Sequence, residues 1–389
     1  MRRLSIKSSI ALVDQDLNAI DNAVIDISDG EITGIGKVPG YANVIDLGNT
    51  VLMPQLTNAH IHVLDYFLIG LYNKYYIDDL VGAPYGLKYY YLRRAKPESL
   101  RAGLSLVFRR IRSYGVGCLL TIIEYGKYFT NIVIEEAKRV GLCVIPLAEP
   151  SAFRVYVKPD EEEDVDETFE EEVRYFVDNG FGISLISPLN YSTAELRLAS
   201  RLAGSRGLLI STHVSETEDT HADGDLDRAL STLVTGNSLF VHLTQLNADE
   251  VSKLPKIPTA ICPRSNIELV NKLPNITAML RNELRPMVGT DNVALIEPNP
   301  WDELRLLRYT VARSPELKPV NLLKMVTSWA WSWGFGYIMR EGLPMRGVAV
   351  GVAYGEVDID HVHDYLLTRL STGDITYLID GSEVTKVVH

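Results

Sequence analysis

Five side chains of the types that bind catalytic metal ions stand at or near the ends of short apolar runs. His60 and His62 are separated by one residue, and His213, His242 and Asp291 lie in three later runs. Because side chains alternate along a β-strand, both imidazoles of a His-X-His pair project from the same face. Neutral imidazole nitrogens with one carboxylate suit Zn²⁺ or Fe²⁺ and leave a position open for water. The pattern predicts a divalent metal site that activates water.

The chain contains a second His-X-His pair, formed by His361 and His363. A single pair of this kind is a weak signal, and no other potential ligand at a strand end accompanies this one. We therefore expect these two residues to be surface or edge-strand residues that bind no metal.

The metal-binding side chains need a scaffold that brings distant strand ends together. From residue 51 onward, short apolar runs alternate with segments of helical periodicity, which is typical of βα units around a parallel sheet. Eight such runs predict a (β/α)8 barrel, in which the active site lies at the C-terminal ends of the strands. The predicted strands are 51–62, 118–124, 142–149, 182–188, 208–213, 238–243, 259–263 and 286–291.

Three intervening helices have local sequence support. An apolar stripe from Leu100 to Ile111 follows Pro97, a residue that suits a first helical turn. Ser192 and Glu195 have the spacing of a capping box. The dipeptide Asn299-Pro300 predicts the start of another helix.

The two ends of the chain have a different character from its middle. Residues 1–50 and 347–389 are rich in short alternating runs broken by turn residues such as Asp29-Gly30. Neither end is long enough to form a stable sheet alone. We predict that they combine into one small composite β-sandwich domain, and that residues 51–346 form the catalytic barrel.

The overall charge restricts the partners of this chain. Its 389 residues include 38 basic and 50 acidic residues, which give a formal charge of −12. This balance argues against nucleic acid or an anionic membrane as a partner. No apolar stretch reaches the roughly eighteen residues needed to cross a membrane. We expect a cytoplasmic protein that acts on a small molecule.

Short motifs around the predicted ligands resemble those of a known family. The motifs are Asn58-Ala59-His60-Ile61-His62, Thr212-His213-Val214-Ser215-Glu216-Thr217, Val241-His242-Leu243, Cys262-Pro263-Arg264-Ser265-Asn266 and Gly289-Thr290-Asp291-Asn292. They resemble motifs of the amidohydrolase superfamily, in the branch that contains cytosine deaminase, guanine deaminase, triazine hydrolases and the methylthioadenosine/S-adenosylhomocysteine deaminases. The resemblance extends over nearly the whole chain.

This resemblance implies roles for individual residues. It implies a metal-ligand set of four residues: His60, His62, His213 and Asp291. It also implies that Glu216 carries a proton to a ring nitrogen of the substrate and that His242 steadies the attacking water. Asp291 would then pass a proton to the departing amine. The alternative for Glu216 is a solvated acid at the start of a helix.

Two features depart from the family pattern. Binuclear relatives bridge two metal ions with a modified lysine on strand four, and the run 182–188 contains no lysine. The resemblance therefore implies one ion, with zinc favoured and iron as the alternative. Glu149 ends strand three, where some relatives use a glutamate as a ligand, and Glu124 stands where many relatives carry aspartate. Their roles stay open.

The loop of residues 63–94 is unusually aromatic. Its aromatic residues are Tyr66, Phe67, Tyr72, Tyr75, Tyr76, Tyr85, Tyr89, Tyr90 and Tyr91. Flat side chains over a metal ion suit a flat heterocyclic substrate. Aromatic residues in such loops also pack subunits together, so a homo-oligomer is the alternative.

The function that these features favour is hydrolytic deamination of an aminated heterocycle, such as a purine or pyrimidine, by a metal-activated water. The same constellation serves a cyclic amidase or a hydrolase of another ring substituent. A non-catalytic binding protein is a third hypothesis, which metal content in the purified protein would separate from the other two.

Overall fold

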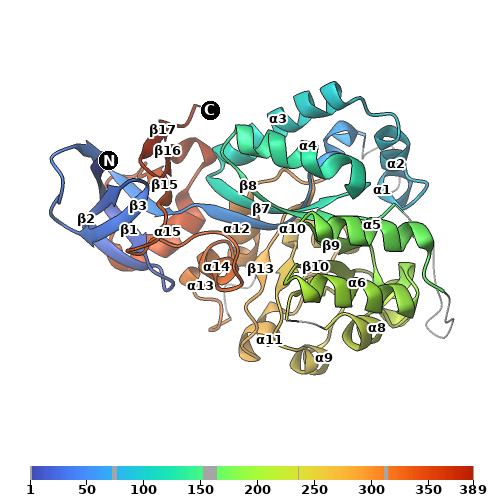
Figure 1. Ribbon diagram of the computed structural model, residues 1–389. Helices are drawn as coiled ribbons and strands as arrows, with labels where there is room; N and C mark the ends of the chain where they lie inside the picture. The colour runs from blue at the N-terminus through green and yellow to red at the C-terminus, as the bar shows by residue number, and fades with distance from the viewer. Residues whose placement is uncertain (1, 72–76, 152–163, 235, 311–313, 389) are drawn as a thin grey trace. The chain divides into compact units, whose positions relative to one another are not determined.

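A computed structural model describes residues 2–71, 77–151, 164–234, 236–310 and 314–388 (Figure 1). Contacts between Cα atoms divide the chain into two compact units. The first contains residues 1–58, 109–118 and 299–389, and the second contains residues 59–108 and 119–298. Among the helices in these described ranges, none is long and apolar enough to span a membrane.

The central element of the structure is a parallel sheet with the strand order β13-β12-β11-β10-β9-β8-β7-β6-β14. Its strands are β6 (Leu56–His62), β7 (Val116–Ile123), β8 (Cys143–Ala148), β9 (Gly182–Leu185), β10 (Ile210–Val214), β11 (Ser238–His242), β12 (Thr259–Ile261), β13 (Met287–Val288) and β14 (Asp291–Asn292). Every residue of β6 and β7 is buried, as expected for barrel strands covered on both faces.

The sheet closes on itself through its last strand. β13 pairs with β12, whereas β14, which two residues separate from β13, pairs with β6. The backbone N–H of Gly289 bonds to Ile261 on one side, and that of Thr290 bonds to His60 on the other. Residues 287–292 therefore act as an eighth strand, and the predicted (β/α)8 barrel is confirmed.

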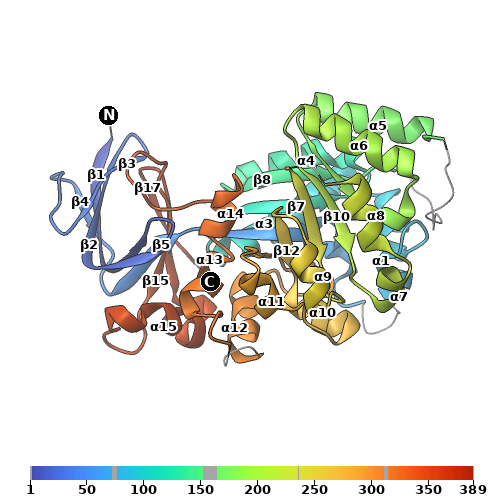
Figure 2. The same cartoon turned by 90° about the horizontal axis from the view of Figure 1, so that it is seen from below.

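Helices connect the parallel strands. The helical segments that follow the strands in chain order are η1 (Val63–Leu68), α1 (Ile77–Val81), α2 (Leu87–Leu92), α3 (Pro97–Ser113), α4 (Gly126–Arg139), α5 (Glu167–Asp178), η3 (Pro188–Asn190), α6 (Thr193–Ser205), α7 (Glu218–Ala222), α8 (Asp225–Thr232), α9 (Ala248–Lys253), α10 (Pro263–Val270), α11 (Ile276–Arg281), α12 (Pro300–Thr310), α13 (Pro319–Lys324) and α14 (Ser328–Ser332). In Figures 1 and 2, α5 and α6 lie side by side against β9 and β10, which the contacts between these elements support.

The three helices expected from the sequence are present. α3 begins at Pro97 and contains the predicted apolar stripe. The capping box of α6 is formed, because Ser192 accepts from the backbone N–H of Glu195 while the Glu195 carboxylate accepts from that of Ser192. α12 begins at Pro300. Local capping chemistry therefore located these helix starts without tertiary information.

Both ends of the chain contribute to one mixed sheet of eight strands. Its order is β17-β16-β15-β5-β1-β2-β3, and β4 pairs with β1. The strands are β1 (Arg3–Val13), β2 (Asn18–Ser28), β3 (Glu31–Gly36), β4 (Val44–Asp46), β5 (Thr50–Pro54), β15 (Arg346–Gly351), β16 (Ile375–Asp380) and β17 (Glu383–Lys386). A core of aliphatic side chains, including Ile6, Ile25 and Ile379, packs on this sheet.

Two local predictions differ from the structure. The run 51–62 was expected to be one barrel strand, but it supplies two strands, because β5 pairs with β1 and β15 before β6 enters the barrel. His361 and His363 were expected in a β region. They lie instead in η4 (Ile359–His361) and α15 (Val362–Arg369), which precede η5 (Thr372–Asp374).

Candidate metal centre and active site

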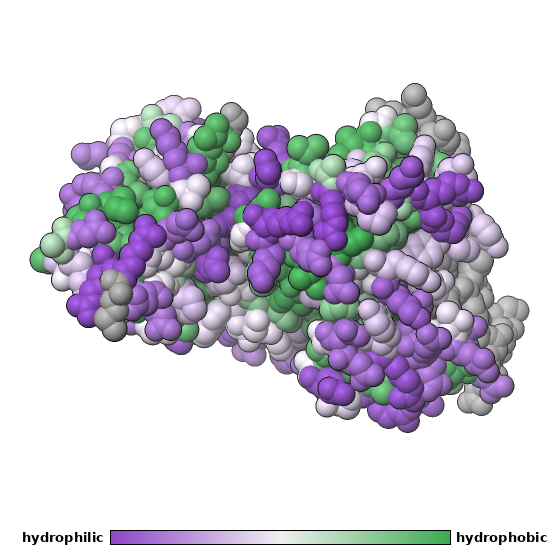
Figure 3. All heavy atoms as spheres, turned by 45° about the horizontal axis from the view of Figure 1, so that its top comes forward, coloured by the Kyte–Doolittle hydropathy of each residue, from purple (hydrophilic) through white to green (hydrophobic). Residues whose placement is uncertain are grey.

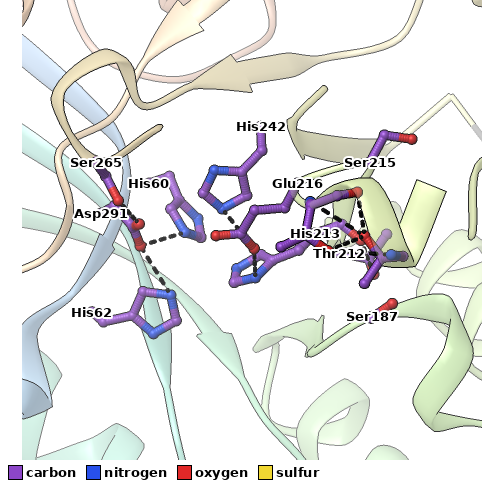
Figure 4. A network of polar contacts seen from close by, with 12 residues as sticks. His60, His62, Ser187, Thr212, His213, Ser215, Glu216, His242, Ser265 and Asp291 are labelled. Carbon is purple, nitrogen blue, oxygen red and sulfur yellow. Dashed lines mark hydrogen bonds and ion pairs between the residues drawn. The ribbon is translucent and has the colours of Figure 1, made fainter. Parts of the chain in front are cut away.

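The structure brings the six predicted site residues together. His60 and His62 lie on β6, His213 on β10, His242 at the end of β11 and Asp291 at the start of β14, while Glu216 follows β10. The ring centroid of His60 lies 5.0 Å from the centroid of His62 and 5.0 Å from that of His213. The ring centroids of His213 and His242 are 4.7 Å apart. Figure 4 shows these side chains pointing toward one another.

The backbone at this cluster adopts uncommon conformations that aim the side chains. His242, Asp291 and Ser215 have φ angles of 73°, 64° and 50°, a region that residues other than glycine seldom adopt. Gly289 passes so close to His60 that an added Cβ would lie 2.7 Å from its backbone oxygen. Such backbone positions concentrate at functional sites, where the surrounding structure compensates for their cost.

Asp291 lies between the two histidines of β6. Its Oδ1 lies 3.4 Å from Nε2 of His60 and 3.6 Å from Nε2 of His62. Its other oxygen, Oδ2, accepts a hydrogen bond of 2.5 Å from the hydroxyl of Ser265. Burial alone would raise the pKa of Asp291, but the contact with His60 and the neighbouring imidazoles lower it well below its ordinary value. The carboxyl group is therefore ionised and available as a ligand.

Glu216 lies between the other two histidines. Its Oε2 is 3.4 Å from Nδ1 of His213 and 3.5 Å from Nε2 of His242. Burial opposes ionisation of this carboxyl group, yet His242 and His213 lower its pKa to about 2. Glu216 is thus an anion at neutral pH that faces the cluster, and the alternative of a solvated helix-start acid is not what the structure shows (Figure 4).

The orientation of His242 is set by Asn266. The amide nitrogen of Asn266 lies 2.9 Å from Nδ1 of His242. When the amide donates to Nδ1, the ring proton resides on Nε2, the nitrogen that faces Glu216. Asn266 ends the motif Cys262-Pro263-Arg264-Ser265-Asn266, whose sequence alone does not indicate this role.

These donors fit a divalent metal ion. The ligand atoms of His60, His62 and His213 lie within 4.8 Å of one another, as do those of His60, His242 and Asp291. Burial, the largest influence, lowers the pKa of His60 to about 3, so its imidazole is neutral at pH 7. Neutral imidazoles and an ionised carboxylate are the ligands that zinc prefers. Sequence reasoning therefore identified a donor set that converges in space.

A second group of charged residues lies behind His62, and sequence reasoning missed most of it. Nδ1 of His62 lies 2.7 Å from Oε1 of Glu124. Burial opposes ionisation of Glu124, but the nearby charge of Lys88 and the contact with His62 outweigh it and lower the pKa of Glu124 to about 2. Lys88 also contacts Glu124 and lies 3.1 Å from Asp65. Asp65 follows His62 by three residues, which was a usable signal. Lys88 lies within the aromatic loop, and nothing in its local sequence distinguishes it.

A cavity of about 310 Å³ opens onto the cluster. Its polar wall includes His62, Lys88, Tyr89, Glu149, His213, Glu216, Asp291 and Asn292. The Tyr89 hydroxyl donates to Glu149 over 3.3 Å. Burial and the nearby charge of Glu124 raise the pKa of Glu149 to about 8, so this carboxyl group is largely protonated at neutral pH. Apolar side chains, among them Ile186, Leu269 and Val270, form the rest of the lining.

The aromatic loop divides between the cavity and the surface. Of its described aromatic residues, Tyr89 lines the cavity, whereas Tyr85, Tyr90 and Tyr91 are exposed. Tyr72, Tyr75 and Tyr76 lie outside the described residues. On the face drawn in Figure 3, hydrophilic residues are intermixed with small hydrophobic patches. The described part of the loop thus contributes Tyr89 to the cavity and leaves Tyr85, Tyr90 and Tyr91 available for contacts elsewhere.

Comparison with known proteins agrees with this fold and site. Residues 51–330 match the model of the amidohydrolase family. A putative aminohydrolase of Methanothermobacter thermautotrophicus is 25% identical over 356 residues, which cover 88% of each chain. A 5-methylthioadenosine/S-adenosylhomocysteine deaminase of Bacillus cereus is 23% identical over 315 residues, or 76% of this chain and 71% of the relative.

The fold is also similar to a solved structure. The crystal structure of an adenosine deaminase from Xanthomonas campestris with bound zinc superimposes with a TM-score of 0.78 and 18% identity, covering 99% of this chain and 93% of that one. A closed parallel barrel with candidate metal ligands at its strand ends is the arrangement of a class of metal-dependent hydrolases. This chain belongs to the amidohydrolase family.

Proposed function

We propose that this protein is a metal-dependent deaminase that hydrolyses the C–N bond of an amino group on a heterocyclic ring. The observation that carries the proposal is the position of Glu216, whose carboxylate lies between His213 and His242 on the wall of a cavity shared with Asp291. An ionised acid at that position can move protons between water and a bound ring.

We propose that His60, His62, His213 and Asp291 bind a single divalent ion, with zinc favoured over iron. β9 (Gly182–Leu185), which is fully described, contains no lysine that could bridge two ions. The adenosine deaminase from Xanthomonas campestris was solved with bound zinc. When bound, such an ion supplies Lewis acidity, which lowers the pKa of water toward neutrality.

The residues of the chain then perform the proton transfers. Glu216 takes a proton from the attacking water and delivers it to the ring nitrogen next to the reacting carbon. His242, with its ring proton on Nε2, steadies the attacking water. Asp291, which is ionised at rest, takes the remaining proton of the added hydroxyl and passes it to the amino group as ammonia departs. The ionised carboxylates of Glu216 and Asp291 can accept these protons, and the Nε2–H of His242 can donate a hydrogen bond.

The cavity favours a small, flat substrate. Its volume of about 310 Å³ lies at the lower end of the range for small-molecule sites. Ile186, Leu269 and Val270 offer apolar contact to a ring, while Tyr89 and Glu149 offer polar groups for its edge. We propose a purine, pyrimidine or related base as the substrate, with residues 51–346 as the catalytic domain and residues 1–50 and 347–389 as an accessory β-sandwich.

A substrate screen tests this proposal. Zinc-loaded protein is incubated with amino-purines, amino-pyrimidines and amino-pterins, and ammonia is measured. Release of ammonia by the wild type, with a much smaller rate for Glu216→Gln, is the expected result. If the protein opens the ring of a cyclic amide and releases no ammonia from any aminated heterocycle, it is a cyclic amidase and not a deaminase. A protein that contains no metal after gentle purification would contradict both.

A further inference from the structure

A lysine ammonium lies beside the candidate metal centre. Lys88 projects from α2, and its Nζ lies 3.1 Å from Oδ1 and 3.2 Å from Oδ2 of Asp65. The same Nζ contacts Oε1 of Glu124. The side chains of Asp65 and Glu124 are fully buried and that of Lys88 is 3% exposed. A lysine is rarely buried to this degree unless its charge is balanced.

This ammonium lies where the chain offers ligands for an ion. The ligand atoms of His62, Asp65 and Glu124 lie within 4.8 Å of one another, so these residues form a group that could hold a metal ion. Lys88 contacts both carboxylates of that group. The ammonium of Lys88 therefore already pairs with the two carboxylates that a second metal ion would need as ligands.

The same contacts connect Lys88 to the proposed metal ligand His62. Oε1 of Glu124 contacts Lys88 on one side and lies 2.7 Å from Nδ1 of His62 on the other. A histidine that donates Nδ1–H to a carboxylate presents its Nε2 lone pair in a fixed direction. Nε2 of His62 is the nitrogen that lies 3.6 Å from Asp291 (Figure 4).

We propose that Lys88 is an internal cation that takes the place of a second metal ion beside His62 and, through Glu124, positions His62 for the single ion. The proposal rests on the metal site of the proposed function. Lys88 is a positioning residue, because it acts on the ligand through Glu124. Asn292, which donates to Oδ2 of Asp65 over 2.5 Å, ties the same acid to the strand that carries Asp291.

The charge balance explains why a cation is required at this position. Asp65 and Glu124 are two buried acids that contact Lys88. Removing one partner from a buried ion pair leaves an uncompensated charge, which is strongly destabilising. The site must then either admit another cation or reorganise, and reorganisation of Glu124 would release His62 from its fixed orientation.

Zinc affinity tests the positioning role. In a competition titration with a chromophoric chelator, Lys88→Met, which keeps volume but removes charge, should bind the first zinc ion about 10 to 100-fold more weakly than the wild type, as removal of outer-shell partners generally does. The double variant Asp65→Asn/Lys88→Met restores the charge balance and should recover much of that loss. Affinity of Lys88→Met within about threefold of the wild type would overturn the proposal.

Metal stoichiometry tests whether the ammonium replaces an ion. Lys88→Ala removes both charge and volume, and it should bind two zinc or manganese ions per chain at saturation, whereas the wild type binds one. Lys88→Met, which fills the space, should bind at most one. Equal stoichiometry of Lys88→Ala and the wild type would show that Lys88 does not exclude a second ion.

A matched lysine controls for general effects of removing charge. Lys127 pairs with Glu171 at 2.6 Å, but both side chains are solvent-exposed to a substantial degree. Lys127→Met should leave affinity and stoichiometry unchanged. If the wild type itself binds no metal, the proposed function fails; if the wild type binds one ion and both Lys88 variants match it, only the inference about Lys88 fails.

Discussion

The chain presents the same motif, His-X-His, in two regions with opposite outcomes. On β6 the rings of His60 and His62 lie 5.0 Å apart and both face Asp291. In the C-terminal segment, His361 contacts Asp358 at 3.6 Å, while Nε2 of His363 lies 2.9 Å from the backbone oxygen of Leu17. The second pair therefore forms two separate contacts rather than one site.

The difference follows from secondary structure. A strand places residues i and i+2 on one face, whereas a helix separates them by about 200° around its axis. The barrel adds a second condition, because it brings His213, His242 and Asp291 from other strands to the same place. Spacing of histidines thus becomes informative only when a strand carries it and other strand ends supply the remaining ligands.

The largest difference between the two His-X-His pairs is expected when one histidine of each pair is replaced by alanine. His60→Ala should abolish metal binding, leaving less than about 0.1 ion per chain, and with it all turnover, because a catalytic site of this type needs each of its few protein ligands. His361→Ala, whose side chain is 79% exposed, should change neither. Elemental analysis after gel filtration measures the metal. Full metal occupancy in His60→Ala would remove His60 from the ligand set.

The second comparison uses the two acids that lie three residues from a histidine. Glu216→Gln should keep its metal and lose turnover by roughly 10² to 10⁴-fold, because the amide cannot transfer the proton. Asp358→Asn alters the equivalent contact of His361, which lies in an exposed pair, and should leave the rate unchanged. Steady-state ammonia release with parallel metal analysis provides both quantities. Loss of metal from Glu216→Gln would instead make this acid a ligand.

The sequence alone was sufficient to predict most of the barrel strands and the six residues that cluster at their ends. Strand ends in a parallel barrel meet at one edge, so identifying His60, His213 and Asp291 as strand-end residues was enough to predict their convergence. The closure of the barrel through 287–292 also followed from the count of eight runs. These features depend on local patterns that repeat along the chain.

Contacts that depend on irregular segments could not be predicted in this way. Lys88 reaches Asp65 and Glu124 from a short helix within a long loop, and no periodicity fixes where such a helix lies. The division of 51–62 into two strands depends on pairing with β15, which is nearly 300 residues away in the sequence. His361 and His363 lie in η4 and α15, two helical segments between β15 and β16 that are too short for a periodic pattern to distinguish them from the neighbouring strands.

A smaller effect is expected from pH on the stability of the metal-free protein. Burial and then Glu124 raise the pKa of Glu149 from its ordinary value of 4.5 to about 8. Between these two values the folded state holds a proton that the unfolded state releases, so this group lowers stability as pH rises from 4.5 to 8. Glu149→Gln mimics the protonated acid and should gain thermal stability relative to the wild type over that interval.

The measurement is the difference between the unfolding midpoints of Glu149→Gln and the wild type across this pH range in chelator. It should increase with pH and then level off above the folded-state pKa. Glu171→Gln, which alters an exposed acid paired with Lys127, serves as the control and should give a flat difference. A difference that stays flat over this range would mean that Glu149 is already ionised in the folded protein.

The smallest effect is expected at His363, the half-buried member of the second His-X-His pair. Its Nε2 donates to the backbone oxygen of Leu17, so it connects α15 to the turn between β1 and β2. His363→Ala should lower the free energy of unfolding by about 1 kcal/mol, the usual contribution of one hydrogen bond, without altering metal content or turnover. Urea unfolding of the zinc-loaded protein measures this change. His363→Asn, which keeps a donor on a shorter side chain, should lose less if the bond to Leu17 is what matters. A loss of metal in His363→Ala would mean that the two His-X-His segments are coupled, and the contrast between a metal-binding strand pair and a structural helix pair would no longer hold.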